Sequence, residues 1–172
     1  REGRIFFGFL GHGSGRYPWD GRAARAVPAG NSRRQVAAPN SRNWEVVYGK
    51  EMMMKDMFGY TGAKVCANMF HQTTDEFNGE LIFPPYYVKR IGGLKIGFIG
   101  YNDPFTPTRQ SPAYSKGIEF KKTEKNVARY IQLLREYEKC QLVILLTHMG
   151  LAQQVGLSSM PFIKGVDYIL GA

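Results

Sequence analysis

A continuous apolar run near the end of the chain constrains the fold more than any other feature. Residues 142–146 read Leu-Val-Ile-Leu-Leu, without a polar position among them. A half-exposed strand alternates apolar and polar residues, whereas such a run suits a strand that is buried on both faces. A membrane-spanning helix needs about 20 apolar residues, and no run in the sequence approaches that length. We therefore expect a central strand over residues 142–146, and no membrane span.

Helical patterns flank this predicted strand. Thr123 can cap a helix over residues 124–139, and a second helix is expected from residue 151. A further strand follows over residues 166–170. The alternation of strands and helices predicts an α/β fold. The apolar face of the first helix has the spacing i, i+3, i+4 and i+7 and consists of Val127, Tyr130, Ile131, Leu134 and Tyr137.

The part of the chain before these elements also has regular patterns. Residues 48–58 read as a helix with an apolar stripe, which we interpret as core rather than as a ligand site. The stripe consists of Met53, Met54, Met57 and Phe58. The other expected elements are a strand over 64–70, a hairpin of strands 86–91 and 94–100 that turns at Gly92 and Gly93, and a loop over 102–117.

The formal charge of +9 is concentrated at the start of the chain. Residues 1–42 contain 8 Arg and 2 acidic residues, which gives +6. Residues 8–42 consist largely of Gly, Arg, Ala and Pro and lack apolar periodicity. We therefore divide the chain into a poorly structured Arg/Gly-rich segment over residues 1–42 and a folded domain over residues 43–172.

Three interpretations of residues 8–42 stay open. The segment is an arm that binds nucleic acid, a disordered linker, or the product of a reading-frame shift in a GC-rich gene. A shift of one base in codons for residues 11–15 gives Asp-Thr-Val-Gln-Gly, which supports the frame shift. We expect no nucleic-acid partner for the folded domain. Resequencing would test the frame shift, because a clean open frame through codons 8–42 would exclude it.

Cysteine and histidine residues offer few candidate ligands. Cys66 and Cys140 are far apart, and neither has a neighbour at metal-ligand spacing, so we interpret both as small buried hydrophobic residues. His12 and His71 are interpreted as exposed loop residues. His148 differs because it follows the predicted central strand, and ligands of α/β sheets bind at the carboxyl ends of strands. Its imidazole suits Zn, Mn or Fe; the alternative is a histidine that only hydrogen-bonds the next loop.

Several motifs together resemble one known family. Residues 147–151 read Thr-His-Met-Gly-Leu, residues 165–171 read Gly-Val-Asp-Tyr-Ile-Leu-Gly, and residues 43–49 read Asn-Trp-Glu-Val-Val-Tyr-Gly. This arrangement resembles the calcineurin-like metallophosphoesterases of the 5′-nucleotidase type, almost continuously over residues 43–172. The resemblance implies a partial αββα sandwich with a mixed β-sheet. It also implies a periplasmic or extracellular location, which the sequence itself leaves unknown.

The resemblance assigns roles to three residues. His148 would ligate one of two divalent metal ions (Mn, Zn or Fe), and Asn43 would ligate a metal and help to hold the phosphate oxygen. Two such ions share a hydroxide and clamp the attacked group. Asn43 and Trp44 are thus the candidate catalytic residues, and a small phosphate ester or nucleotide is the expected substrate. The implied activity is that of a metal-dependent hydrolase.

Trp44 departs from the family pattern. Phosphoesterases of this type have His at this position, and indole donates an N–H but does not act as an acid. A Trp-Glu pair resembles the thiosulfohydrolase branch, which is the alternative activity; a basic nucleic-acid-binding module is an alternative of another class. Trp44 can also be a packing residue. Further ligands of the family would precede Arg1 or follow Ala172, so we expect this fragment by itself to be inactive.

Overall fold

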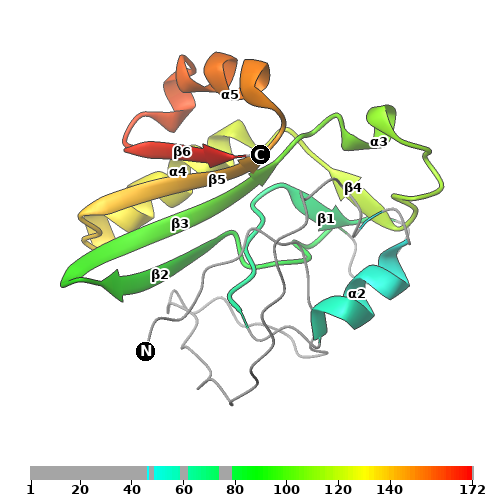
Figure 1. Ribbon diagram of the computed structural model, residues 1–172, viewed down its shortest axis with the longest axis horizontal. Coiled ribbons are helices and arrows are strands. Elements are labelled where there is room, and N and C mark those ends of the chain that lie inside the picture. Colours follow the sequence, from blue (N-terminus) through cyan, green and yellow to red (C-terminus); the bar gives the residue numbers. More distant parts are fainter. Residues whose placement is uncertain (1–45, 47–48, 59–61, 74–78, 172) are drawn as a thin grey trace.

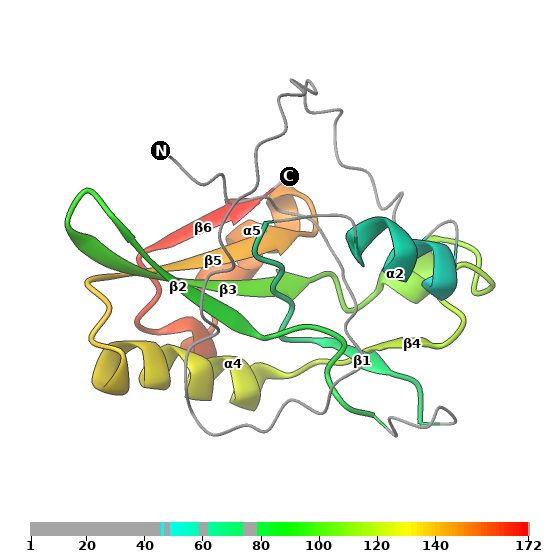
Figure 2. The same ribbon diagram turned by 90° about the horizontal axis from the view of Figure 1, so that it is seen from below.

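The computed structural model describes residues 46, 49–58, 62–73 and 79–171. The predictions for residues 1–42, Asn43 and Trp44 lie outside these residues. Figure 1 shows a central sheet with helices packed beside it, and Figure 2 shows α4 lying along one face of that sheet. Among the described residues, no helix is long and apolar enough to cross a membrane.

The main sheet has four strands in the order β2-β3-β5-β6. Its strands are β2 (Tyr86–Ile91), β3 (Leu94–Asn102), β5 (Leu142–His148) and β6 (Tyr168–Gly171). β2 is antiparallel to β3, whereas β3, β5 and β6 are mutually parallel. The predicted mixed sheet is therefore confirmed, and the apolar run of residues 142–146 lies in an inner strand, as expected.

The β2–β3 hairpin forms at the predicted glycines. Gly92 and Gly93 connect the strands with φ angles of +57° and +85°. Two successive positive φ values are typical of the tight turn whose twist matches that of a hairpin. The hairpin register pairs Ile91 with Leu94.

Helices complete two strand–helix–strand units. Between β3 and β5 lies α4 (Glu124–Gln132), which continues as the π-helical turn η1 (Leu133–Tyr137). Between β5 and β6 lie α5 (Leu151–Ser158) and the 3₁₀ turn η2 (Pro161–Ile163). The predicted α/β alternation is confirmed. The remaining elements are α2 (Lys50–Phe58), the short helix α3 (Thr106–Arg109) and a two-stranded sheet of β1 (Met69–His71) and β4 (Ile118–Phe120).

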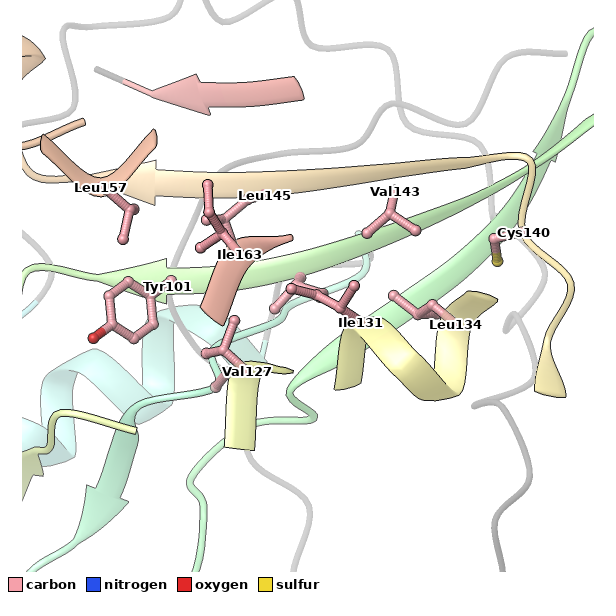
Figure 3. Close-up of a cluster of buried hydrophobic side chains, with 11 residues drawn as sticks. Tyr101, Val127, Ile131, Leu134, Cys140, Val143, Leu145, Leu157 and Ile163 are labelled. Atoms are coloured by element: carbon pink, nitrogen blue, oxygen red, sulfur yellow. The ribbon is translucent and has the colours of Figure 1, made fainter. Parts of the chain in front are cut away.

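The two faces of the main sheet have separate apolar clusters. Figure 3 shows the larger cluster, in which α4, η1, α5 and η2 pack against β3 and β5. It includes Ile99, Val127, Ile131, Leu134 and Leu145. The opposite face carries Ile96, Phe98 and Leu146. A third cluster joins α2 to β1 and β4, and it contains the predicted core residues Met53, Met54 and Met57.

Three details of the predicted helices and strands are wrong. The strand expected over residues 64–70 begins only at Met69, because the preceding residues cross the end of the main sheet and make single backbone bonds, such as Ala67 N to Gly100 O at 2.7 Å. Tyr137 is 77% exposed, because Glu138 N bonds Leu133 O five residues back and the wider turn rotates Tyr137 off the apolar face. The loop over 102–117 contains α3 and the end of β3.

Two side-chain predictions also need correction. Thr123 lies at the N-cap of α4, but its hydroxyl donates to Ala67 O at 3.1 Å and does not cap the helix. His71 is not an exposed loop residue: it lies in β1 opposite Ile118 and is 4% exposed. Cys66 and Cys140 are free and buried, as predicted.

Candidate functional site

The carboxyl ends of β3 and β5 form one edge of the main sheet. The last pair in their parallel register is Asn102 with His148, and Tyr101 pairs with Thr147 one step earlier. Side chains at the same register position of neighbouring strands lie on the same face of a sheet. Asn102 and His148 therefore lie side by side on one face, at the edge where α/β sheets bind ligands. Figure 1 shows both strands running toward this edge.

His148 is the last residue of β5, whose backbone pairs with β3, and its side chain is half-exposed. Asp103 N donates to His148 O at 3.3 Å, which ties the loop after β3 to the end of β5. The chain then turns through Gly150 into α5. The predicted position of His148 at a strand end is confirmed, and its imidazole is accessible to a ligand.

Asp103 is buried and its carboxylate is already in use. Oδ1 accepts from Phe105 N at 2.9 Å, and Oδ2 pairs with Arg109 Nε at 2.6 Å. Gln153 Nε2 approaches Oδ1 at 3.5 Å. Asp103 thus caps the turn that follows β3. Because both oxygens have cationic or N–H partners, Asp103 is a support of the edge rather than an available metal ligand.

Asn68 fixes the backbone of Asn102. Its Nδ2 donates to Asn102 O at 2.7 Å, and its Oδ1 accepts from Asn102 N at 2.8 Å. Asn68 is fully buried, so these bonds form away from water. The two bonds resemble a rung of a β-ladder made by a side chain, and they hold the end of β3 in one position.

Several buried polar atoms at this edge have no hydrogen-bond partner. They are both side-chain polar atoms of Asn102, the hydroxyl oxygen of Thr147 and Oε1 of Gln153. A buried polar group without a partner costs about 1–3 kcal/mol, so such groups are rare in folded proteins. Thr147 lies on the sheet face opposite to that of His148, so the Asn102 carboxamide is the strand residue of this group that shares the face of His148.

The described residues supply only part of a metal site. Among them there is no group of three or more His, Cys, Asp or Glu side chains that could hold an ion. Burial raises the pKa of the Cys66 thiol to about 11, so this sulfur is not a thiolate ligand near neutral pH. His148 fits as one imidazole ligand, and the ligation by Asn43 stays a prediction because that residue lies outside the described part.

The aspartate of the motif over residues 165–171 has a structural role. Asp167 lies at the start of β6, at the opposite end of the sheet from His148. Its Oδ2 accepts from Val143 N at 2.6 Å and pairs with Arg135 Nη2, which also donates to Gly165 O. These bonds fix the entry of β6 beside β5.

Sequence reasoning missed Asn68 and Asn102. Asn68 falls inside the strand predicted over residues 64–70, and Asn102 falls in the loop predicted over residues 102–117. A usable signal existed for Asn102, because it follows the apolar residues 96–101 at the point where the strand ends. Nothing in the sequence shows that Asn68 reaches Asn102, since the two are 34 residues apart.

Sequence comparison relates this chain to nucleotidases. No protein-family model matches it. A 5′-nucleotidase of Vibrio cholerae is 34% identical over 76 residues, which is 44% of this chain and 14% of that protein. The protein UshA of Escherichia coli is 34% identical over 84 residues, 49% of this chain and 14% of its own length. The chain is similar in sequence to 5′-nucleotidases over somewhat less than half of its length. It spans about one seventh of the length of these curated relatives.

Solved structures share the fold of this chain. The sulfate thiohydrolase SoxB of Thermus thermophilus superposes with a TM-score of 0.63 at 24% identity, over 74% of this chain and 22% of that one. The calcineurin-like phosphoesterase YfkN of Bacillus subtilis gives 0.58 at 21% identity, over 75% of this chain and 42% of that one. The predicted metallophosphoesterase fold is therefore confirmed for most of the chain.

Proposed function

We propose that this chain forms part of a metal-dependent hydrolase of phosphate esters, of the 5′-nucleotidase type, in which His148 ligates a metal ion. One observation supports this most strongly: a half-exposed imidazole at the carboxyl end of an inner strand, in a chain similar in sequence to 5′-nucleotidases. Nucleotides are the substrates that the names of these relatives indicate.

The residues of the candidate site would hold the metal ions and orient the substrate. Divalent ions bound at this edge would activate water and stabilise the charge on the attacked group. His148 would hold one ion from the end of the inner strand β5, and neutral imidazole suits Mn, Zn or Fe. By the family resemblance, Asn43 would ligate a metal and help to hold the phosphate oxygen, and Trp44 follows it in the sequence.

Trp44 favours a second candidate on the same site. A Trp-Glu pair at residues 44–45 resembles the thiosulfohydrolases, and indole does not protonate a leaving group. A sulfur-linked substrate with a good leaving group would not need that proton. Histidine at this position could protonate a leaving group. If phosphate esters are the substrate, Trp44→His should therefore raise the rate of AMP hydrolysis more than the rate of hydrolysis of a thiosulfate adduct.

The test compares substrates in a protein that carries this chain within the full length of its relatives. With Mn or Zn, release of phosphate from AMP supports the first candidate, and release of sulfate from a thiosulfate adduct supports the second. His148→Ala should remove metal and activity with little loss of fold. His12→Ala is the control, because His12 matches no ligand position. Full metal content and turnover in His148→Ala would contradict the proposal.

A further inference from the structure

Asn102 presents a carboxamide whose place is fixed but whose hydrogen-bonding groups are unused. Its backbone N–H and C=O both bond Asn68, at 2.8 and 2.7 Å. Its side chain is 2% exposed, and neither Oδ1 nor Nδ2 has a partner. Asn68 shows the contrast within the same fold, because both of its side-chain polar atoms are bonded.

The position of this carboxamide connects it to the candidate site. Asn102 shares a register position and a sheet face with His148. A buried amide lacking both bonds is costly in free energy, and water or an apolar side chain of similar size would remove that cost. A ligand that bonds the amide at this edge gives a physical reason for an asparagine here.

The charges next to Asn102 in the chain do not oppose an anionic oxygen as that ligand. The nearest acidic neighbour in the chain, Asp103, has its carboxylate neutralised by Arg109 Nε at 2.6 Å and by Phe105 N–H. The Arg109 guanidinium is about half exposed at the same edge. An amide N–H that donates to an ionised oxygen makes a stronger bond than one between neutral groups.

We infer that Asn102 is a substrate-binding residue whose Nδ2 donates to an oxygen of a tetrahedral oxyanion, phosphate or sulfate, held beside His148. This inference rests on the proposed function and adds to it a contact that the metal ligands do not make. It assigns Asn102 to the recognition of the reacting group, and it assigns Asn68 to the positioning of Asn102.

The test follows the Asn102 side-chain amide by NMR in the ¹⁵N-labelled 172-residue chain. Inorganic phosphate and sulfate are added in separate titrations at constant ionic strength, each without metal and with Mg²⁺. At least one anion should shift the Asn102 side-chain signals along a saturable curve. A response to phosphate alone indicates a phosphate ester as substrate, and a response to sulfate alone indicates the sulfur-linked substrate.

Substitutions separate an oxyanion contact from other roles. Asn102→Asp keeps the shape but replaces the donor with a negative charge, so it should weaken anion binding by roughly tenfold or more. Asn126→Asp makes the same charge change at an exposed position of α4 and should alter binding by less than about twofold. If Asn102→Asp misfolds, the wild-type side-chain signals still give the answer.

Two results would overturn the inference. One is that neither anion moves the Asn102 side-chain signals under either condition. The other is that folded Asn102→Asp binds the anion as tightly as wild type. Failure of the proposed function would look different. The metal ion would then leave the NMR signals of His148 unchanged, while the Asn102 side-chain signals would still respond to anions.

Discussion

Buried polar residues near the end of β3 differ in how their hydrogen bonds are satisfied. Asn68 uses its amide to hold the backbone of Asn102, whereas the Asn102 side chain has no partner. Cys66 donates its thiol proton toward Asn68 Oδ1 at 3.4 Å. Hydrogen-bond satisfaction, and not residue type, is thus the basis on which we infer a structural role for Asn68 and a ligand-binding role for Asn102.

Because Cys66 is buried, the free energy of unfolding should decrease at alkaline pH. Burial raises the pKa of this thiol from 9.0 to about 11. The unfolded chain loses the thiol proton first, so the free energy of unfolding should fall between about pH 9 and 11, by roughly 2–3 kcal/mol at most. Urea unfolding at pH 8, 9.5 and 10.5 would measure this fall.

Cys66→Ala is the matched control for that pH dependence. The variant should be less stable at pH 8 but lose less stability than wild type as the pH rises. Burial also raises the pKa of Tyr101 to about 12, and this contribution remains in both proteins. If the free energy of unfolding falls with pH equally in the two proteins, the pKa of Cys66 is not raised in the folded state.

At the scale of elements, sequence patterns predicted what local periodicity and turns determine. The central strand of residues 142–146, the hairpin at Gly92 and Gly93 and both strand–helix–strand units are present. The late start of β1 and the π-helical turn η1 are not evident from the sequence, since both depend on backbone contacts that local periodicity does not encode. His148 was placed at a strand end by the same local reasoning, but the buried bonds around Asn102 require the folded structure.

Alanine substitutions at two glycines should change the stability of the protein in opposite directions. A Cβ at Gly100 would lie 2.0 Å from Val65 O, whereas a Cβ at Gly156 in α5 would meet nothing within 4 Å. Gly100→Ala should therefore destabilise the protein by about 2 kcal/mol or more. Gly156→Ala should stabilise it by about 0.5–1 kcal/mol, because alanine favours the helix.

Urea midpoints of the two variants and wild type would check these values. The prediction requires opposite signs for the two substitutions. If Gly100→Ala is as stable as wild type, the segment of residues 62–68 does not cross the end of β3 as closely as the structure has it.

At the scale of the whole molecule, most of the positive charge precedes the residues whose packing the structure describes. Residues 1–42 carry +6 of the +9 charge, and their composition lacks the apolar periodicity of a packed element. All described helices and strands of the main sheet come from later residues. The division between residues 42 and 43 stays a prediction from composition.

Removal of residues 1–42 tests that division. The shortened chain should keep the amide NMR spectrum of residues 80–171 and a urea midpoint close to that of the full chain, because the main sheet and α4 would retain their packing. Collapse of the dispersed spectrum would show that the Arg/Gly-rich segment is part of the fold.

The central claim is that His148 marks a metal-binding edge, and paramagnetic NMR with Mn²⁺ tests it most directly. Even at low occupancy, Mn²⁺ should first broaden the signals of His148 and its register partner Asn102, and His148→Ala should abolish this pattern while the chain stays folded. Broadening that is centred elsewhere, or that persists unchanged in His148→Ala, would contradict the account.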